Sequence, residues 1–176
     1  LLLLLPASEF AILCIQWASS RVIPPKRLPR LECAGGVPDH ARTMVIVPTM
    51  LTSVAGVEAL VEHIEVLALG NLDPLIHFAI LSDFPDTGTP DVPEDAAILE
   101  RARKGVEALN VKLGSDRADR FFLFHRDRQW NVGEQAWIGW ERKRGKIEEF
   151  NRLLRGATDT SFSTQVGRLD VLTSVR

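Results

Sequence analysis

Continuous apolar runs punctuate the middle of the chain at regular intervals. The runs at residues 43–47, 76–82 and 120–125 are rich in β-branched and aromatic side chains, with few polar breaks. Such runs are typical of strands that are buried on both faces of a parallel sheet. The pattern therefore predicts three strands of one parallel sheet.

Amphipathic stretches lie between and after these runs. Apolar residues recur at helical spacing over residues 53–69, 93–113 and 145–155, and each stretch begins or ends at residues that commonly terminate helices. A strand, a helix and a strand in this length form a right-handed crossover unit. We expect an α/β fold with a parallel sheet and flanking helices. Residues 126–140 and 158–167 are expected to be loops, and the apolar residues from Val171 onward suggest the start of another strand.

The first 23 residues are mostly apolar, and their number suits a membrane-spanning helix. Pro6, Glu9 and Gln16 oppose this interpretation, because a carboxylate at the centre of a bilayer costs about 2.5–3.5 kcal/mol on insertion scales. A buried amphipathic helix of a soluble protein is the alternative. The basic residues that follow would place the next part of the chain in the cytoplasm.

Prolines and glycines over residues 24–41 indicate an irregular linker. The compact domain is expected to begin near Arg42 and to run to residue 176. Because the chain begins with Leu1 rather than methionine, we interpret it as an internal piece of a longer protein.

Composition excludes some classes of partner. The 176 residues include 21 basic and 23 acidic side chains, for a formal net charge of −2. A nucleic-acid-binding protein would show a basic excess, so no nucleic acid is expected. Cys14 and Cys33 fit reduced thiols better than a disulfide framework. The four histidines stand singly, without the paired spacing of zinc ligands, so solvent or packing roles are expected for them.

Two polar residues fall near the apolar face of the helix predicted over residues 145–155. At 100° per residue, Lys146 lies at the edge of the apolar arc, beside Phe150, and Asn151 lies within it. A lysine among apolar neighbours needs an anion or a route to water, and a buried amide needs hydrogen-bond partners. These positions indicate a polar site on the inner side of the helix.

Basic residues also gather where this helix begins. Arg142, Lys143 and Arg144 precede Gly145 and Lys146. Cationic side chains, the amides of the turn at Gly145 and the positive end of the helix dipole together predict a diphosphate site. The alternative is a basic turn whose charges lie in water.

Further candidates follow the predicted strands, because ligands of parallel α/β sheets bind beyond the carboxyl ends of strands. Thr49 and Asp83 occupy such positions. Asp83 could accept a hydrogen bond from a nucleobase or ribose, or it could cap the turn before Pro85.

Three tryptophans, Trp130, Trp137 and Trp140, fall within one predicted loop. Their flat faces could stack on sugar rings, or they could pin the loop onto the domain.

Several of these segments resemble known glycosyltransferases. Gly145 and Lys146, followed by Asn151, resemble the Gly-Lys-x-x-x-x-Asn helix of processive inverting glycosyltransferases with the GT-A fold, and residues 45–49 and 81–83 resemble their first two strand ends. More specifically, four segments are similar to the transferase part of cyclic β-1,2-glucan synthases, glycosyltransferase family 84: residues 42–49, 77–84, 121–125 and 140–160.

The resemblance implies a partial GT-A-like, Rossmann-like sheet that belongs to a large bacterial inner-membrane protein. In such a protein, a cytoplasmic transferase domain moves glucose from UDP-glucose to a growing glucan acceptor with the help of Mg²⁺ or Mn²⁺, and downstream domains of the same polypeptide control length. By position, Thr49 and Asp83 would hold the uridine, and Arg144, Lys146 and Asn151 would complete the nucleotide-sugar site. Trp137 and Trp140 would line the acceptor path.

The family's Asp-x-Asp metal motif and its catalytic base lie further along than the residues matched here. We therefore expect no catalytic or metal-ligating residue in this chain, and we expect residues 42–176 to be the N-terminal part of a transferase domain, inactive alone. Two other hypotheses stay open. One is a non-catalytic nucleotide-binding or anion-binding module. The other is a structural, membrane-tethered domain in which Lys146 and Asn151 are satisfied internally.

Overall fold

The computed structural model describes residues 3–23, 35–114 and 119–175. The chain divides into two compact units, Leu1–Ala34 and Gly35–Arg176, and each is described by itself. The second unit begins before the predicted Arg42, because the Val37 amide donates to the Asp73 carboxylate (2.5 Å). Residues 24–34 of the predicted linker, with Cys33, lie outside the described residues.

In the first unit, α1 (Leu4–Val22) is an exposed helix whose described side chains include no buried residue. Within the described parts of the chain, no helix combines the length and the apolar character that crossing a membrane requires. The prediction of a membrane-spanning helix over residues 1–23 is therefore not supported. Polar residues such as Glu9 and Gln16 interrupt the apolar run and lower its mean hydropathy.

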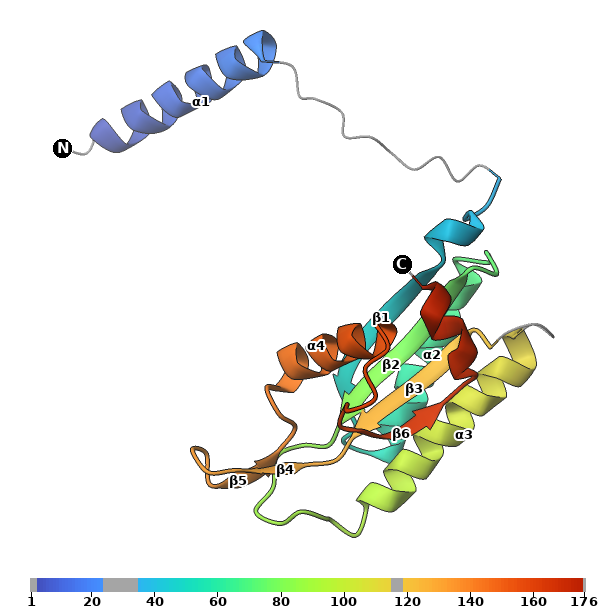
Figure 1. Ribbon diagram of the computed structural model, residues 1–176. Coiled ribbons are helices and arrows are strands. Elements are labelled where there is room, and N and C mark those ends of the chain that lie inside the picture. Colours follow the sequence, from blue (N-terminus) through green and yellow to red (C-terminus); the bar gives the residue numbers. More distant parts are fainter. Residues whose placement is uncertain (1–2, 24–34, 115–118, 176) are drawn as a thin grey trace. The chain divides into compact units, whose positions relative to one another are not determined.

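The second unit is built around a mixed sheet. Among the described residues, its strands follow the order β1 (Thr43–Met50), β2 (Ile76–Asp83), β3 (Phe121–Arg126) and β6 (Phe162–Val166), as Figure 1 shows. The first three strands are parallel, and β6 pairs antiparallel with β3. The predicted α/β fold with a parallel sheet is confirmed.

The position of β1 corrects one prediction. It lies at an edge of the described sheet and is only partly buried, whereas its apolar run predicts burial on both faces. The strand continues through Pro48, which an edge strand tolerates because it needs fewer backbone donors.

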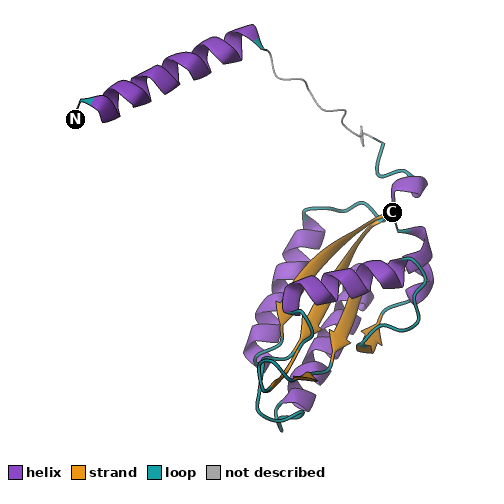
Figure 2. Ribbon diagram, turned by 60° about the vertical axis from the view of Figure 1, so that its left-hand side comes forward, coloured by secondary structure: helices purple, strands orange, loops and turns teal. Residues whose placement is uncertain are grey.

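Helices cover both faces of the sheet (Figure 2). On one face lie α2 (Val54–Leu69) and α3 (Asp95–Leu113), and on the other lie α4 (Arg142–Leu154) and the 3₁₀ helix η2 (Leu169–Ser174). The alternation of strand side chains separates the two cores. In β2, Phe78 and Ile80 pack in the core with α2 and α3, while Ala79 and Leu81 pack in the core with α4.

Three further elements differ from the sequence-based expectation. The predicted loop over residues 126–140 contains the hairpin of β4 (Gln129–Asn131) and β5 (Ala136–Ile138), and the predicted loop over 158–167 contains β6. The residues from Val171 form η2 instead of a strand. All three elements are short, so they carry too few apolar positions to establish a period.

Candidate functional site

The carboxyl ends of the parallel strands bring Asp83 beside Arg126. The two residues are register partners at the ends of β2 and β3, and Met50 at the end of β1 is the partner of Asp83 on its other side. Both residues are almost fully buried, with relative exposures of 2% and 1% for the whole residues. This is the edge of the sheet at which ligands of α/β proteins bind.

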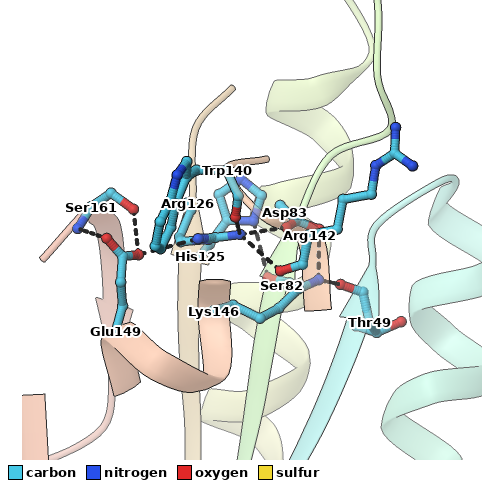
Figure 3. A network of polar contacts seen from close by, with 10 residues as sticks. All are labelled: Thr49, Ser82, Asp83, His125, Arg126, Trp140, Arg142, Lys146, Glu149 and Ser161. Carbon is cyan, nitrogen blue, oxygen red and sulfur yellow. Dashed lines mark hydrogen bonds and ion pairs between the residues drawn. The ribbon is translucent and has the colours of Figure 1, made fainter. Parts of the chain in front are cut away.

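From α4, Lys146 reaches the same edge. Its Nζ donates to the Thr49 carbonyl (2.5 Å) and to Asp83 Oδ1 (2.7 Å), as Figure 3 shows. The predicted inward position of Lys146 is therefore confirmed, and the structure brings together three residues that the sequence analysis selects. The anion that satisfies the buried ammonium is a carboxylate of the protein itself.

Arg126 is the centre of the arrangement. One of its guanidinium nitrogens, Nη2, lies 2.9 Å from Asp83 Oδ2, and the other, Nη1, lies 3.2 Å from Glu149 Oε2. Nη2 also donates to the backbone carbonyls of Trp140 (3.0 Å) and Arg142 (3.2 Å). A buried arginine with this many acceptors fixes the entry to α4 against the strand ends.

Ser161 completes the set by donating its Oγ–H to Glu149 Oε2 (2.6 Å) and its backbone N–H to Oε1 (3.3 Å). We call these residues the strand-end network: Thr49, Asp83, Arg126, Lys146, Glu149 and Ser161. Its two cations and two anions balance one another, which is the condition under which buried charges are tolerated.

Burial and ion pairing shift the pKa of Lys146 in opposite directions. Desolvation lowers the pKa of its ammonium, and the nearby Arg126 charge lowers it further, while the hydrogen bond and charge of Asp83 raise it. The net effect is a lowered pKa for Lys146. Burial therefore destabilises the charged ammonium, and Asp83 offsets part of this effect.

The backbone over residues 139–142 closes over the network and is strained. Glu141 (φ 49°) and Arg142 (φ 45°) both adopt the left-handed conformation, which is unfavourable for residues other than glycine. A Cβ atom on Gly139 would lie 2.4 Å from Asp83 Oδ2, so only glycine fits there without displacement. Access to Asp83 thus depends on this segment.

The start of α4 corrects a second prediction. The helix begins at Arg142, three residues before the predicted start, and Gly145 lies inside it. A Cβ atom at Gly145 would lie 2.1 Å from the Trp140 carbonyl oxygen, so this glycine permits a close backbone approach. The amides of a turn at Gly145 are therefore not part of the site.

Two of the predicted site residues do not join Lys146. The Arg144 side chain is 75% exposed, and Asn151 is exposed on the outer face of α4. The predicted inward position of Asn151 is wrong, because the most buried face of the helix runs through Lys146, Glu149 and Phe150, while Ile147 is only partly buried beside it. Both residues instead line a surface hollow of about 710 Å³ that excludes Lys146.

The three tryptophans separate into different environments. Trp137 is half-buried, and its backbone forms two hydrogen bonds with Thr87 (2.8 and 3.0 Å). Trp130 and Trp140 are 45% and 42% exposed. The alternative that a tryptophan pins the loop thus describes Trp137, whereas the other two present their rings to solvent.

Sequence reasoning missed Arg126 and Glu149. Arg126 ends an otherwise apolar strand, and Glu149 falls three residues after the inward Lys146, on the same helical face. The basic residue at the end of an apolar run could have indicated Arg126, and the acidic residue three positions after Lys146 could have indicated Glu149.

His125 extends the buried polar set beneath the network. It is fully buried, its Nδ1 lies 3.0 Å from Ser82 Oγ, and its ring packs edge-on against Phe84. Desolvation lowers the pKa of this imidazole to about 4, so the ring is neutral at physiological pH. The packing role expected from sequence is confirmed for His125 and also for the buried His77.

Within the described ranges, no group of three or more histidine, cysteine or acidic residues is placed to hold a metal ion. The strand-end network itself pairs its carboxylates with Arg126 and Lys146, which does not suit a cation.

Comparison with known proteins shows which protein the chain is similar to. No protein-family model matches it. It is 43% identical over 162 residues to the cyclic beta-(1,2)-glucan synthase NdvB of Rhizobium meliloti (strain 1021). The chain matches a segment of a cyclic glucan synthase. The match covers 92% of this chain but only 6% of the relative. The resemblance to cyclic β-1,2-glucan synthases that the sequence motifs indicate is thereby confirmed for this segment.

Proposed function

We propose that this chain forms the nucleotide-binding side of a UDP-glucose-dependent transferase domain that extends a β-1,2-glucan. The observation that carries the proposal is the position of Lys146, which spans the carboxyl ends of β1 and β2 by contacting Thr49 and Asp83. The similarity to a glucan synthase supports a sugar donor and a glucan acceptor as its substrates. The parallel sheet with its helices is compatible with the GT-A-like architecture that the motifs resemble.

In this proposal, Asp83 accepts a hydrogen bond from uracil or ribose, and Lys146 holds the carboxylate in position. Because Asp83 is 2% exposed and Gly139 lies against it, the 139–142 segment has to move for a ligand to reach it. The first turn of α4 contains basic residues and no acidic residue, a composition that favours an anion near the positive end of the helix dipole. The diphosphate would take that place, with Arg144 nearby.

The remaining machinery of an inverting transfer would come from outside these residues. Such a reaction needs a base for the acceptor hydroxyl and a divalent cation, Mg²⁺ or Mn²⁺, on the leaving diphosphate. We propose that both are supplied by other parts of the full-length protein and that this chain alone is inactive. A location at the bacterial inner membrane stays a prediction.

A structural role is the second candidate function, and one observation favours it. Lys146 finds its partners inside the protein, at the Thr49 carbonyl and Asp83, so no ligand is required to satisfy it. In that case the strand-end network would serve only to fix α4 on the sheet.

Calorimetric titration with UDP and UDP-glucose separates the two candidates. The chain is compared with a Lys146→Met variant and with Arg155→Met, which changes an exposed basic residue at the far end of α4. Nucleotide binding that weakens about tenfold or more only in Lys146→Met supports the proposal. No binding by the folded chain, and none by a longer segment of the protein with Mn²⁺ present, would leave the structural role ahead.

A further inference from the structure

The β4–β5 hairpin carries a groove that lies outside the strand-end network. Two neighbouring hollows of about 280 and 220 Å³ open on it, and they share the lining residues Asn131, Ile138 and Trp140. Together they fall within the range of about 300–1,000 Å³ that is typical of ligand pockets. The groove is thus large enough for a chain of small rings.

Exposed indole rings border this groove. Trp130 lines one hollow and Trp140 lines both, and each ring is more than 40% exposed. In the part of the chain that the structure describes, no side-chain hydrogen bond is made by either indole. Large aromatic rings on the surface, each with an N–H group that can still donate a hydrogen bond, indicate a ligand with both an apolar face and polar groups.

The polar residues of the groove match hydroxyl groups. Gln129 and Asn131 supply amides, Glu134 and Glu141 carboxylates, and Arg142 a guanidinium. Glu134 is paired with Arg142 at 2.9 Å and Glu141 with Arg144 at 3.8 Å, so each of the two carboxylates has a basic partner. A neutral, hydroxyl-rich ligand fits this lining better than a charged one.

The tryptophan rings of the groove are held in place before any ligand binds. The rings of Trp130 and Trp137 lie 5.9 Å apart, and Trp137 is fixed by its backbone pairing with Thr87. The side chain of Trp140 packs so closely on Gly145 that an added Cβ atom would lie 2.7 Å from its ring. Binding would therefore order few side chains, which favours affinity.

Trp140 and Arg142 connect this groove to the strand-end network. Their carbonyl oxygens accept hydrogen bonds from Arg126, which is paired with Asp83, while their side chains line the groove. Figure 3 shows both residues beside Arg126. A sugar in the groove would thus lie next to the proposed nucleotide site.

We propose that the hairpin groove binds pyranose rings of a glucan chain, with Trp130 and Trp140 as the stacking surfaces. The polar side chains would bond the ring hydroxyls. The choice of a glucan rests on the proposed function. The assignment replaces Trp137 by Trp130, because the half-buried Trp137 supports the groove from behind.

The test is a calorimetric titration of the chain with a linear β-1,2-linked glucooligosaccharide. Trp130→Ala is expected to weaken binding about tenfold or more. Trp17→Ala, at an exposed position of α1, is the matched control and should leave the affinity unchanged. Equal affinity of Trp130→Ala and the unaltered chain, or no binding by the chain, would overturn the proposal.

A second readout requires no substitution. The indole N–H signals of the four tryptophans are followed by nuclear magnetic resonance during the same titration. Shifts of Trp130 and Trp140 without a shift of Trp17 support the groove, and unchanged Trp130 and Trp140 signals contradict it. A parallel UDP titration of the unaltered chain separates the two proposals. UDP binding without glucan binding refutes only the groove, and glucan binding without UDP binding refutes only the nucleotide site.

Discussion

Lys146 Nζ lies 2.7 Å from Asp83 Oδ1, although the two residues are 63 positions apart and belong to different elements. Both side chains are 3% exposed. Since Arg126 binds the other oxygen of the same carboxylate, Asp83 is held by two cations, one at each oxygen. This pairing joins α4 to the sheet and also defines the proposed ligand site.

Removing either partner of the Lys146–Asp83 pair should destabilise the fold, and the effects of the two substitutions should not be additive. Lys146→Met and Asp83→Asn each leave a buried charge with fewer partners, and their double-mutant cycle should give a coupling of about 1–3 kcal/mol. Urea unfolding measures it. Arg101 and Glu58 form a matched exposed pair at 3.0 Å, for which the coupling should stay below about 1 kcal/mol. Equal coupling in the two cycles would show that the buried pair has no special role.

Gly139, which lies against Asp83, should not tolerate a side chain. Gly139→Ala places a methyl group 2.4 Å from Asp83 Oδ2, so the carboxylate or the 139–142 segment has to shift. We expect a loss of about 1–3 kcal/mol in the free energy of unfolding and weaker UDP binding. Gly88→Ala is the control, because an added Cβ there meets nothing within 4 Å. Identical stability of the two variants would argue against the close contact.

Relieving the strain before α4 should stabilise the chain. Glu141 has a φ of 49°, and its carboxylate makes one long contact of 3.8 Å with Arg144. Glu141→Gly should therefore raise the free energy of unfolding by about 1 kcal/mol. The same substitution at Glu148, an exposed position within α4, should lower it by about 1 kcal/mol. Thermal unfolding of both variants is the measurement, and destabilisation by Glu141→Gly would contradict the strain.

His125 should make the fold sensitive to acid. The unfolded chain takes up a proton on this imidazole near its ordinary pKa of 6.5, whereas the buried ring resists protonation until about pH 4. Acidification through this window therefore favours the unfolded state, by about 3 kcal/mol in total.

In a His125→Asn variant, the free energy of unfolding should fall less steeply between pH 6.5 and 4 than in the unaltered chain. Chemical unfolding at a series of pH values tests this, and parallel slopes for His125→Asn and the unaltered chain would refute the assignment.

The longer elements could be predicted from sequence because each carries a clear period. Predicted helices over residues 53–69 and 93–113 correspond to α2 and α3, and the three long strands lie where their apolar runs indicate. Short elements such as β4 and β5 gave no such signal. The edge position of β1 could not be read from its apolar run either, since strand order is set by pairing between distant segments.

The site was predictable only in part. Thr49, Asp83 and Lys146 were found because strand ends and a misplaced lysine are visible in sequence. The orientation of Asn151 was not, because the rotation of α4 depends on tertiary contacts such as the pairing of Glu149 with Arg126. That partnership spans 23 positions and cannot be derived from helical spacing alone.

The most direct test of the central claim locates the nucleotide on the unaltered chain. Backbone amide signals are assigned and followed by nuclear magnetic resonance during titration with UDP-glucose. The account predicts shifts at the ends of β1 and β2, around Thr49 and Asp83, and over residues 139–146 at the start of α4. Shifts confined to the outer face of α4 around Asn151, or no shifts at saturating ligand, would contradict it.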